Sequence, residues 1–267
     1  MCLILLAASV HPRFPLIVAA NRDEAYARPA APAAFWEDYP QVCAGRDLLQ
    51  GGTWLGVTRD GRFAAITNYR QGVSRRDTSR SRGELTRDYL TGSQEISTYL
   101  KGVSARDPDF NGYSLIAGTP EQLFFCSNRG DGAAPIPPGV HGLSNRLLNE
   151  PWPKVQRGRS VLNGLLDAEE ADLTAALFEL LADTRAAPDH LLPSTGIALE
   201  RERILSAAFI PGDIYGTRAS TVLLVADDGH VLFCERRFGP HGTRTGDSEL
   251  RFRLAPKPAA SRPHATA

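Results

Sequence analysis

The residue with the clearest chemical potential in this chain is Cys2, which directly follows the initiator methionine. Initiator methionine is usually removed when the second residue is small, and its removal would place a thiol and a free α-amine on one residue. Their ordinary pKa values, about 8.5 and about 7.7–8.0, are close enough for the amine to act as the base of the thiol. The alternative is that Cys2 is a small buried apolar residue at the start of a strand.

Two short apolar runs, residues 2–9 and 16–20, flank a turn that contains two prolines. They predict a buried β-hairpin and are too short to cross a bilayer, which takes roughly 20 apolar residues. A symmetric hairpin would place Cys2 opposite Asp23, with Arg22 one position away. The Arg22 guanidinium would then favour the thiolate and lower the thiol pKa, while Asp23 would hold and polarise the amine.

The composition excludes several classes of protein. Thirty acidic residues balance thirty basic ones, so no overall charge recruits nucleic acid or an anionic membrane. The first residues lack the basic segment of a signal peptide. The chain has four widely spaced cysteines and no CxxC pair, which argues against a zinc ribbon and a disulfide framework. We therefore expect a cytoplasmic protein with no metal site and no membrane span.

A second hairpin is predicted around the dipeptide Asp60-Gly61, between residues 54–58 and 62–68. Its second strand ends at Asn68, whose side-chain amide could donate to a substrate oxyanion there, or could simply cap a turn. Before this hairpin, Gly51 and Gly52 would allow a close approach of the backbone to a ligand or to another strand.

The other predicted elements surround these hairpins. Prolines make residues 25–40 a loop, and residues 70–82 form an arginine-rich segment that is either a solvated loop or a binding site for phosphate or carboxylate. Strands near both ends with helices between them predict two packed sheets covered by helices. We expect one domain, residues 1–255, and a disordered-looking tail, residues 256–267. Helices are predicted near 82–90, 93–100, 153–166, 171–182 and 200–209, and further strands near 113–117, 122–127, 139–145, 215–225, 231–237 and 252–254.

The start MCLI followed by Asn21-Arg22-Asp23-Glu24 resembles the NRDE family, which includes the transport and Golgi organisation protein 2 group. That family is similar in layout to N-terminal nucleophile hydrolases of the choloylglycine hydrolase and penicillin V acylase kind. Those proteins have an αββα sandwich and begin, after processing, with a catalytic cysteine. The stretches that support the resemblance are Gly51–Gly56, Thr67–Arg70, Leu143–Asn145 and Tyr215–Thr221.

The resemblance implies an α+β fold, a four-layer αββα sandwich of two mainly antiparallel sheets. It implies six catalytic residues and no metal or required cofactor. The Cys2 thiolate would attack an amide or acyl (thio)ester carbonyl of a small or acylated substrate, as a cysteine amidohydrolase or an acyltransferase. The six residues are Cys2, Arg22, Asp23, Asn68, Asn145 and Arg218.

The same family knowledge supports a different activity, because its members are also implicated in haem trafficking and in lipid or acyl-CoA homeostasis. A non-enzymatic carrier would bind haem or an acylated ligand in the same cleft. The sequence has no CxxCH motif and its six histidines are scattered; His141, between Gly139 and Gly142, is the candidate haem ligand among them. A third possibility is an interaction protein that keeps an old catalytic fold.

Overall fold

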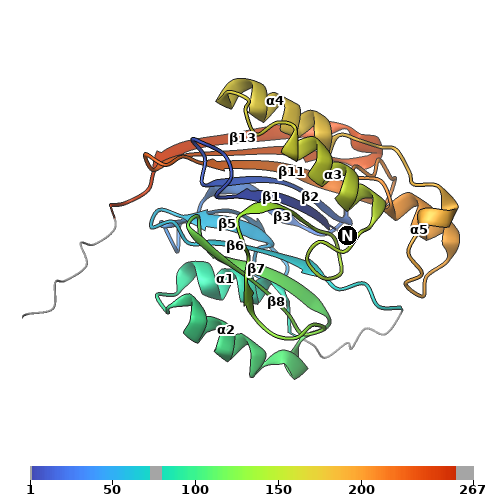
Figure 1. Cartoon of the computed structure of the whole chain (residues 1–267). Coiled ribbons are helices and arrows are strands. Elements are labelled where there is room, and N and C mark those ends of the chain that lie inside the picture. The colour runs from blue at the N-terminus through green and yellow to red at the C-terminus, as the bar shows by residue number, and fades with distance from the viewer. Residues whose placement is uncertain (1, 73–79, 257–267) are drawn as a thin grey trace, which may run out of the picture.

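The computed structural model describes residues 2–72 and 80–256, and this part of the chain forms two antiparallel sheets stacked face to face (Figure 1). In spatial order, sheet A contains β10 (Gly139–Leu143), β1 (Cys2–Ala8), β2 (Leu16–Ala25), β11 (Tyr215–Val225), β12 (His230–Phe238) and β13 (Arg244–Arg253). Sheet B contains β3 (Ala30–Phe35), β4 (Val42–Asp47), β5 (Leu55–Thr58), β6 (Phe63–Asn68), β7 (Tyr113–Thr119), β8 (Gln122–Ser127) and β9 (Ala134–Pro135).

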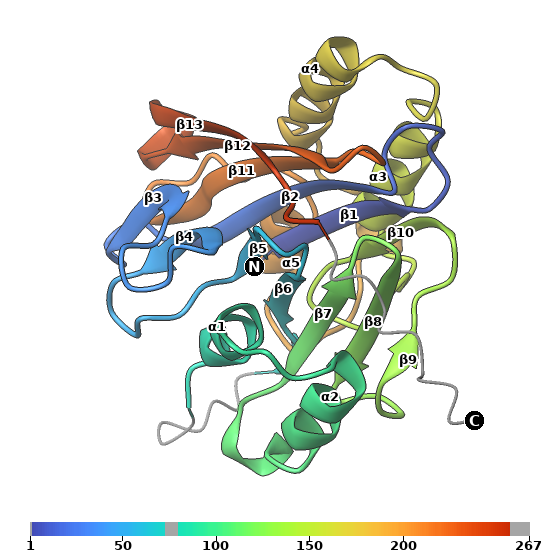
Figure 2. The ribbon, with the colours of Figure 1, turned by 90° about the vertical axis from the view of Figure 1, so that its left-hand side faces the viewer.

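Helices cover the outer face of each sheet (Figures 1 and 2). Sheet B is covered by α1 (Gly83–Thr91) and α2 (Ile96–Ser104), and sheet A by α3 (Pro153–Asn163) and α4 (Glu170–Leu181). A fifth helix, α5 (Leu199–Leu205), and three 3-10 turns (Asp107–Asp109, Asp189–Leu191 and Pro240–Gly242) complete the described elements. None of the described helices is long and apolar enough to cross a membrane.

Three apolar layers hold this sandwich together. In β1, Ile4 and Leu6 point between the sheets, whereas Leu3 and Leu5 point towards α3 and α4. Both faces of the strand are covered, so all seven of its residues are buried. Burying a large aliphatic side chain contributes about 1.5–3 kcal/mol, which explains an uninterrupted apolar sequence where a half-exposed strand would alternate. The predicted αββα arrangement, helix–sheet–sheet–helix, is confirmed.

The structure corrects one predicted loop and confirms one hairpin. Residues 30–35, predicted as loop, form strand β3. This strand lies at the edge of sheet B and its pairing with β4 is irregular between Ala31 and Ala34, so Pro32 is tolerated there. The hairpin around Asp60-Gly61 is confirmed as β5 and β6. Residues 73–79 of the predicted basic segment and 257–267 of the predicted tail lie outside the described residues.

The register of the first hairpin differs from the predicted one by a single residue. Ala8 pairs with Leu16, and Ser9, at a φ of +53°, already belongs to the turn. Cys2 therefore lies opposite Arg22 instead of Asp23. Because opposed residues share a face, Cys2 and Arg22 point between the sheets, and Asp23 points to the helix side of sheet A.

Candidate functional site

Polar groups surround Cys2, the first residue of β1. Its main-chain N–H donates to Asn145 Oδ1 at 3.2 Å, and its carbonyl oxygen accepts a hydrogen bond from Ser144 Oγ at 3.0 Å. The backbone N–H of Asp23 donates to the Cys2 sulfur. Only 7% of Cys2 is exposed. The start of the chain is thus held in place by hydrogen bonds at its nitrogen, its oxygen and its sulfur.

Asn145, which follows β10, connects the two sheets at this point. It adopts a left-handed conformation, with φ at +55°, which asparagine tolerates better than most residues. Its Nδ2 donates to the carbonyl oxygen of Asn68 at 3.1 Å, and its own carbonyl accepts the N–H of Arg70 at 2.7 Å. The end of β6 in sheet B is therefore joined to the start of β1 in sheet A. The main chain of Asn68 makes this contact, and its side chain is half-buried.

The Cys2 thiol is not activated at rest. Burial raises its pKa above the ordinary value, and the opposing effect of the Arg22 guanidinium is smaller. Arg22 acts on this pKa in the predicted direction, but in the chain that keeps Met1 the desolvation of a thiolate outweighs it. Any chemistry at this sulfur requires a base that removes the proton.

Asp23 lies on the helix side of sheet A, where it is 3% exposed. Thr217 in β11, which pairs with Asp23 in the sheet, donates from Oγ1 to Asp23 Oδ1 at 2.7 Å. Burial raises the pKa of this carboxyl, and the positive charges of the N-terminus of the chain and of Lys154 oppose the rise. A buried carboxylate with a nearby ammonium thus lies directly behind Cys2.

Lys154 itself was not recognised from the sequence. It is the second residue of α3, only 2% exposed, and its Nζ donates to the carbonyl oxygen of Ala207 at 3.4 Å. Burial lowers its pKa to about 8. The available signal was composition: the chain has three lysines, and this one begins an amphipathic helix directly after Pro153. We call Cys2, Asp23, Asn145 and Lys154 the Cys2 centre.

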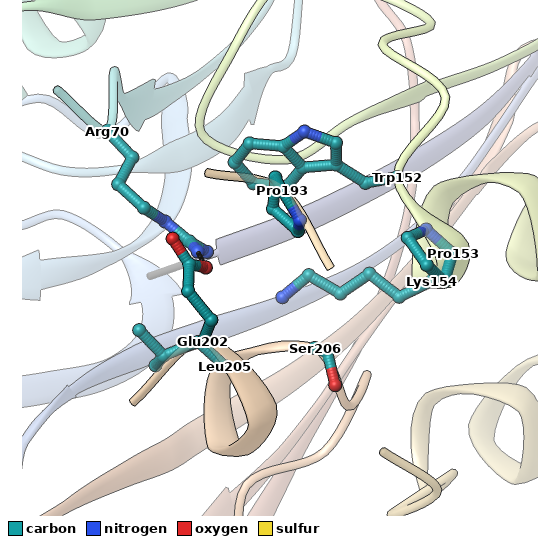
Figure 3. Close-up of a pocket in the computed structure, with 8 residues that line it drawn as sticks. All are labelled: Arg70, Trp152, Pro153, Lys154, Pro193, Glu202, Leu205 and Ser206. Carbon is teal, nitrogen blue, oxygen red and sulfur yellow. Dashed lines mark hydrogen bonds and ion pairs between the residues drawn. The ribbon is translucent and has the colours of Figure 1, made fainter. Parts of the chain in front are cut away.

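A buried ion pair borders this centre (Figure 3). The Arg70 guanidinium pairs with Glu202 and lies over the ring of Trp152, 4.5 Å from its centroid. Glu202 also accepts the N–H of Thr195 at 3.2 Å, and burial lowers the pKa of Arg70 to about 10. The prediction grouped Arg70 with a basic loop, but it is buried. The small pocket here, about 10 Å³, is lined by Arg70, Trp152, Pro153, Lys154, Pro193, Glu202, Leu205 and Ser206.

The two predicted site arginines occupy the other side of sheet A. Arg22 shares the face of Cys2, and its guanidinium nitrogen Nη2 lies 3.9 Å from Asp47 Oδ2 and 4.0 Å from Glu24 Oε2. Arg218, at a bulge in β11, donates to the carbonyl oxygens of Ala25 and Arg28, at 3.4 Å for Ala25. The structure therefore brings Arg22 to Cys2, whereas the hydrogen bonds of Arg218 hold the turn after β2.

The candidate haem ligand His141 is buried in β10, and both of its ring nitrogens are engaged. Nε2 lies 2.8 Å from the carbonyl oxygen of Pro137 and Nδ1 lies 3.0 Å from Asn149 Nδ2. This arrangement leaves no ring nitrogen directed at a ligand, so His141 does not fit the role of a haem ligand. Within residues 2–72 and 80–256, no three His, Cys, Asp or Glu side chains gather as they would around a metal ion.

Comparisons with solved structures find proteins of low sequence identity. One is an N-acylethanolamine-hydrolyzing acid amidase ortholog from Caenorhabditis elegans, 14% identical over 84% of this chain and 92% of that chain, with a TM-score of 0.49. Another is the C2A mutant of conjugated bile acid hydrolase from Clostridium perfringens, 7% identical over 95% of this chain and 92% of that chain, with a TM-score of 0.47.

Comparisons with sequences find much nearer relatives. The Bos taurus Transport and Golgi organization protein 2 homolog is 38% identical over 276 residues, which cover 95% of this chain and 99% of the relative. The Homo sapiens homolog is 36% identical over 258 residues, or 88% of this chain and 92% of the relative. The family model for Transport and Golgi organisation 2 matches residues 1–240. On this evidence, the chain belongs to the Transport and Golgi organisation 2 family.

Proposed function

We propose that this protein is an N-terminal cysteine nucleophile enzyme, an amidohydrolase or acyltransferase, that acts on an amide or acyl thioester after Met1 is removed. The observation that carries the proposal is the hydrogen bond from the Cys2 nitrogen to Asn145 Oδ1, beside the buried charges of Asp23 and Lys154. Removing ions from water costs several kcal/mol each. A cysteine that merely filled space at a strand start would not call for this environment.

The chemistry begins with the proton of the Cys2 thiol. Once Met1 is lost, the Cys2 nitrogen is an amine, and one of its N–H groups can keep the bond to Asn145. Its lone pair takes the thiol proton, so the amine becomes an ammonium and the sulfur a thiolate. The raised resting pKa of the thiol makes such an internal base necessary. Arg22, on the same face as Cys2, stabilises the thiolate as it forms.

Attack of the thiolate on the substrate carbonyl carbon forms a carbon–sulfur bond and moves the carbonyl electron pair onto oxygen. Asn68, at the end of β6, is the candidate side-chain donor to this oxyanion. When the oxyanion collapses, the bond to the leaving amine or thiol breaks, and the Cys2 ammonium gives that group its proton. Water, or an acceptor amine or alcohol, then attacks the acyl-cysteine and regenerates the thiol.

We place this activity in the cytoplasm. The support is that all four cysteines, Cys2, Cys43, Cys126 and Cys234, are free in the structure. Unpaired thiols are typical of a reducing compartment. The substrate is a small or acylated molecule, and nothing in the balanced charge of the chain favours nucleic acid.

The test is intact-mass analysis of the native protein with and without iodoacetamide. We expect loss of one methionine and a single rapid adduct at Cys2. Cys43 is the internal control, because it is fully buried and burial raises its pKa to about 12. The Cys2→Ala variant should lose the rapid adduct and all turnover of amide and thioester probes.

Retained Met1, together with Cys2 labelling no faster than Cys43, would overturn this proposal. The carrier hypothesis would then take its place. Its signature is binding of haem, an acyl-CoA or a lipid that persists in the Cys2→Ala variant.

A further inference from the structure

Lys154 is the most unusual charged residue in the described part of the chain. It is 98% removed from solvent, yet the described structure gives its Nζ one hydrogen bond, to Ala207 at 3.4 Å. That distance is at the long limit for a hydrogen bond, and an ammonium has three protons to donate. Capping one carbonyl does not explain why a charge is buried here, since an isolated buried ammonium is very costly.

The charges that face Lys154 do explain it. Asp23 in β2, Cys2 in β1 and Glu202 in α5 favour the ammonium form, whereas Arg70 after β6 opposes it. The Lys154 side chain extends from the start of α3 towards the pocket that it shares with Arg70 and Glu202 (Figure 3). Lys154 in turn opposes the raised pKa of Asp23, together with the positive charge at the N-terminus of the chain, which acts more strongly, and with Arg70, which also pairs with Glu202.

We propose that Lys154 is a positioning residue of the Cys2 centre, whose ammonium keeps the buried Asp23 carboxylate charged so that Asp23 can hold the Cys2 amine. This inference rests on the proposed function. The physical reason is the position of Asp23, buried behind β2 with a neutral hydroxyl, Thr217, donating to one of its oxygens. Without a nearby cation, a carboxyl group in such a place becomes neutral at physiological pH, and a neutral carboxyl holds an amine poorly.

The coupling between Lys154 and Asp23 can be measured without any assay of activity. The chain has three lysines, Lys101, Lys154 and Lys257, so lysine labelled with ¹⁵N at Nζ gives at most three signals to follow by NMR during a pH titration. We expect Lys154 to titrate near pH 8, below the ordinary range of a lysine, and to titrate still lower in the Asp23→Asn variant. Unchanged titration of Lys154 in that variant would overturn the proposal.

The consequence for Cys2 is measured by the pH dependence of its alkylation in the processed protein. Lys154→Met removes a cation that interacts with Cys2 and favours its thiolate, so the rise of the rate should move to higher pH. At pH 7 the rate should then fall, about tenfold for a midpoint one pH unit higher. Lys154→Arg, which keeps the charge, should restore the midpoint, and Lys101→Met on the exposed side of α2 should match the unmodified chain.

The two proposals fail in different ways. If Cys2 of the unmodified chain reacts no faster than Cys43, the proposed function is wrong, while the lysine titration still decides the pairing of Lys154 and Asp23. If Cys2 is reactive and Lys154→Met leaves its pH profile unchanged, the role of Lys154 is wrong and the proposed function stands. Should Lys154→Met fail to fold, the titration of the unmodified chain and of Asp23→Asn gives the answer.

Discussion

Replacing Asn145 tests how much the hydrogen bonds of its side chain, which join the two sheets at the Cys2 centre, stabilise the fold. Asn145→Ala leaves the Cys2 N–H and the Asn68 carbonyl without their partners. An unsatisfied buried group costs about 1–3 kcal/mol, with the low end appropriate for the half-buried Asn68. Alanine at a φ of +55° adds about 1 kcal/mol. We expect the free energy of unfolding to fall by about 3–5 kcal/mol in total.

The measurement is urea unfolding at pH 7 followed by tryptophan fluorescence. Asn145→Gly loses the same two hydrogen bonds but carries no left-handed penalty, so it should be about 1 kcal/mol more stable than Asn145→Ala. Asn163→Ala, at an exposed position at the end of α3, is the matched control and should stay within about 0.5 kcal/mol of the unmodified chain. An alanine variant as stable as the unmodified chain, or more stable than the glycine variant, would refute this reasoning.

Three further changes have a defined direction. In Gly52→Ala the new Cβ would lie 2.6 Å from the backbone carbonyl at the start of α1, so thermal denaturation should show that the free energy of unfolding falls by about 1–3 kcal/mol. Gly102→Ala, in open space on α2, is the matched control, and its free energy of unfolding should rise by about 0.5–1 kcal/mol. Burial raises the pKa of Glu235. The unmodified chain should therefore lose stability relative to Glu235→Gln as the pH rises from about 4.5 through the raised pKa, because ionisation then favours the unfolded chain. Equal differences in urea midpoint between the two proteins at pH 4 and pH 8 would contradict this. Arg22→Gln should slow alkylation of Cys2 at pH 7, because it removes a cation that lowers the thiol pKa, and an equal rate would show that Arg22 does not act on the sulfur.

Local patterns predicted most of the strands and helices, although β4 (Val42–Asp47) was not predicted and β13 (Arg244–Arg253) was predicted only at its end. The apolar runs, the Asp60-Gly61 turn and Pro153 at a helix start each act within a few residues of chain, and the elements they predict are present. Strand β3 was missed because its prolines are local signals against a strand. Its place at the sheet edge, which makes a proline acceptable, depends on the topology of the whole sheet.

The site was only partly predictable, for a related reason. The hairpin brought Arg22 and Asp23 near Cys2, but the exact register depended on where Ser9 leaves the strand, and one residue decides which of the two shares the face of the thiol. The burial of Lys154 and Arg70 depends on contacts with segments that are distant in sequence. Nothing in the residues near Arg70 indicates that it is buried, and the signal near Lys154 is limited to its place at the start of an amphipathic helix.

The hydrogen bond from the Cys2 nitrogen to Asn145 could persist after the removal of Met1, and this would link folding to activation. In the full-length chain the donor is an amide N–H, whose nitrogen has no lone pair available to accept a proton. Asn145 Oδ1 can only accept, so it holds an amine by one N–H in the same place. The amine then has a lone pair that the amide lacked, a short distance from the sulfur of its own residue. Removal of Met1 would therefore create the base at a position that the fold has already fixed, and a chain that keeps Met1 should fold equally well while its thiol stays unreactive.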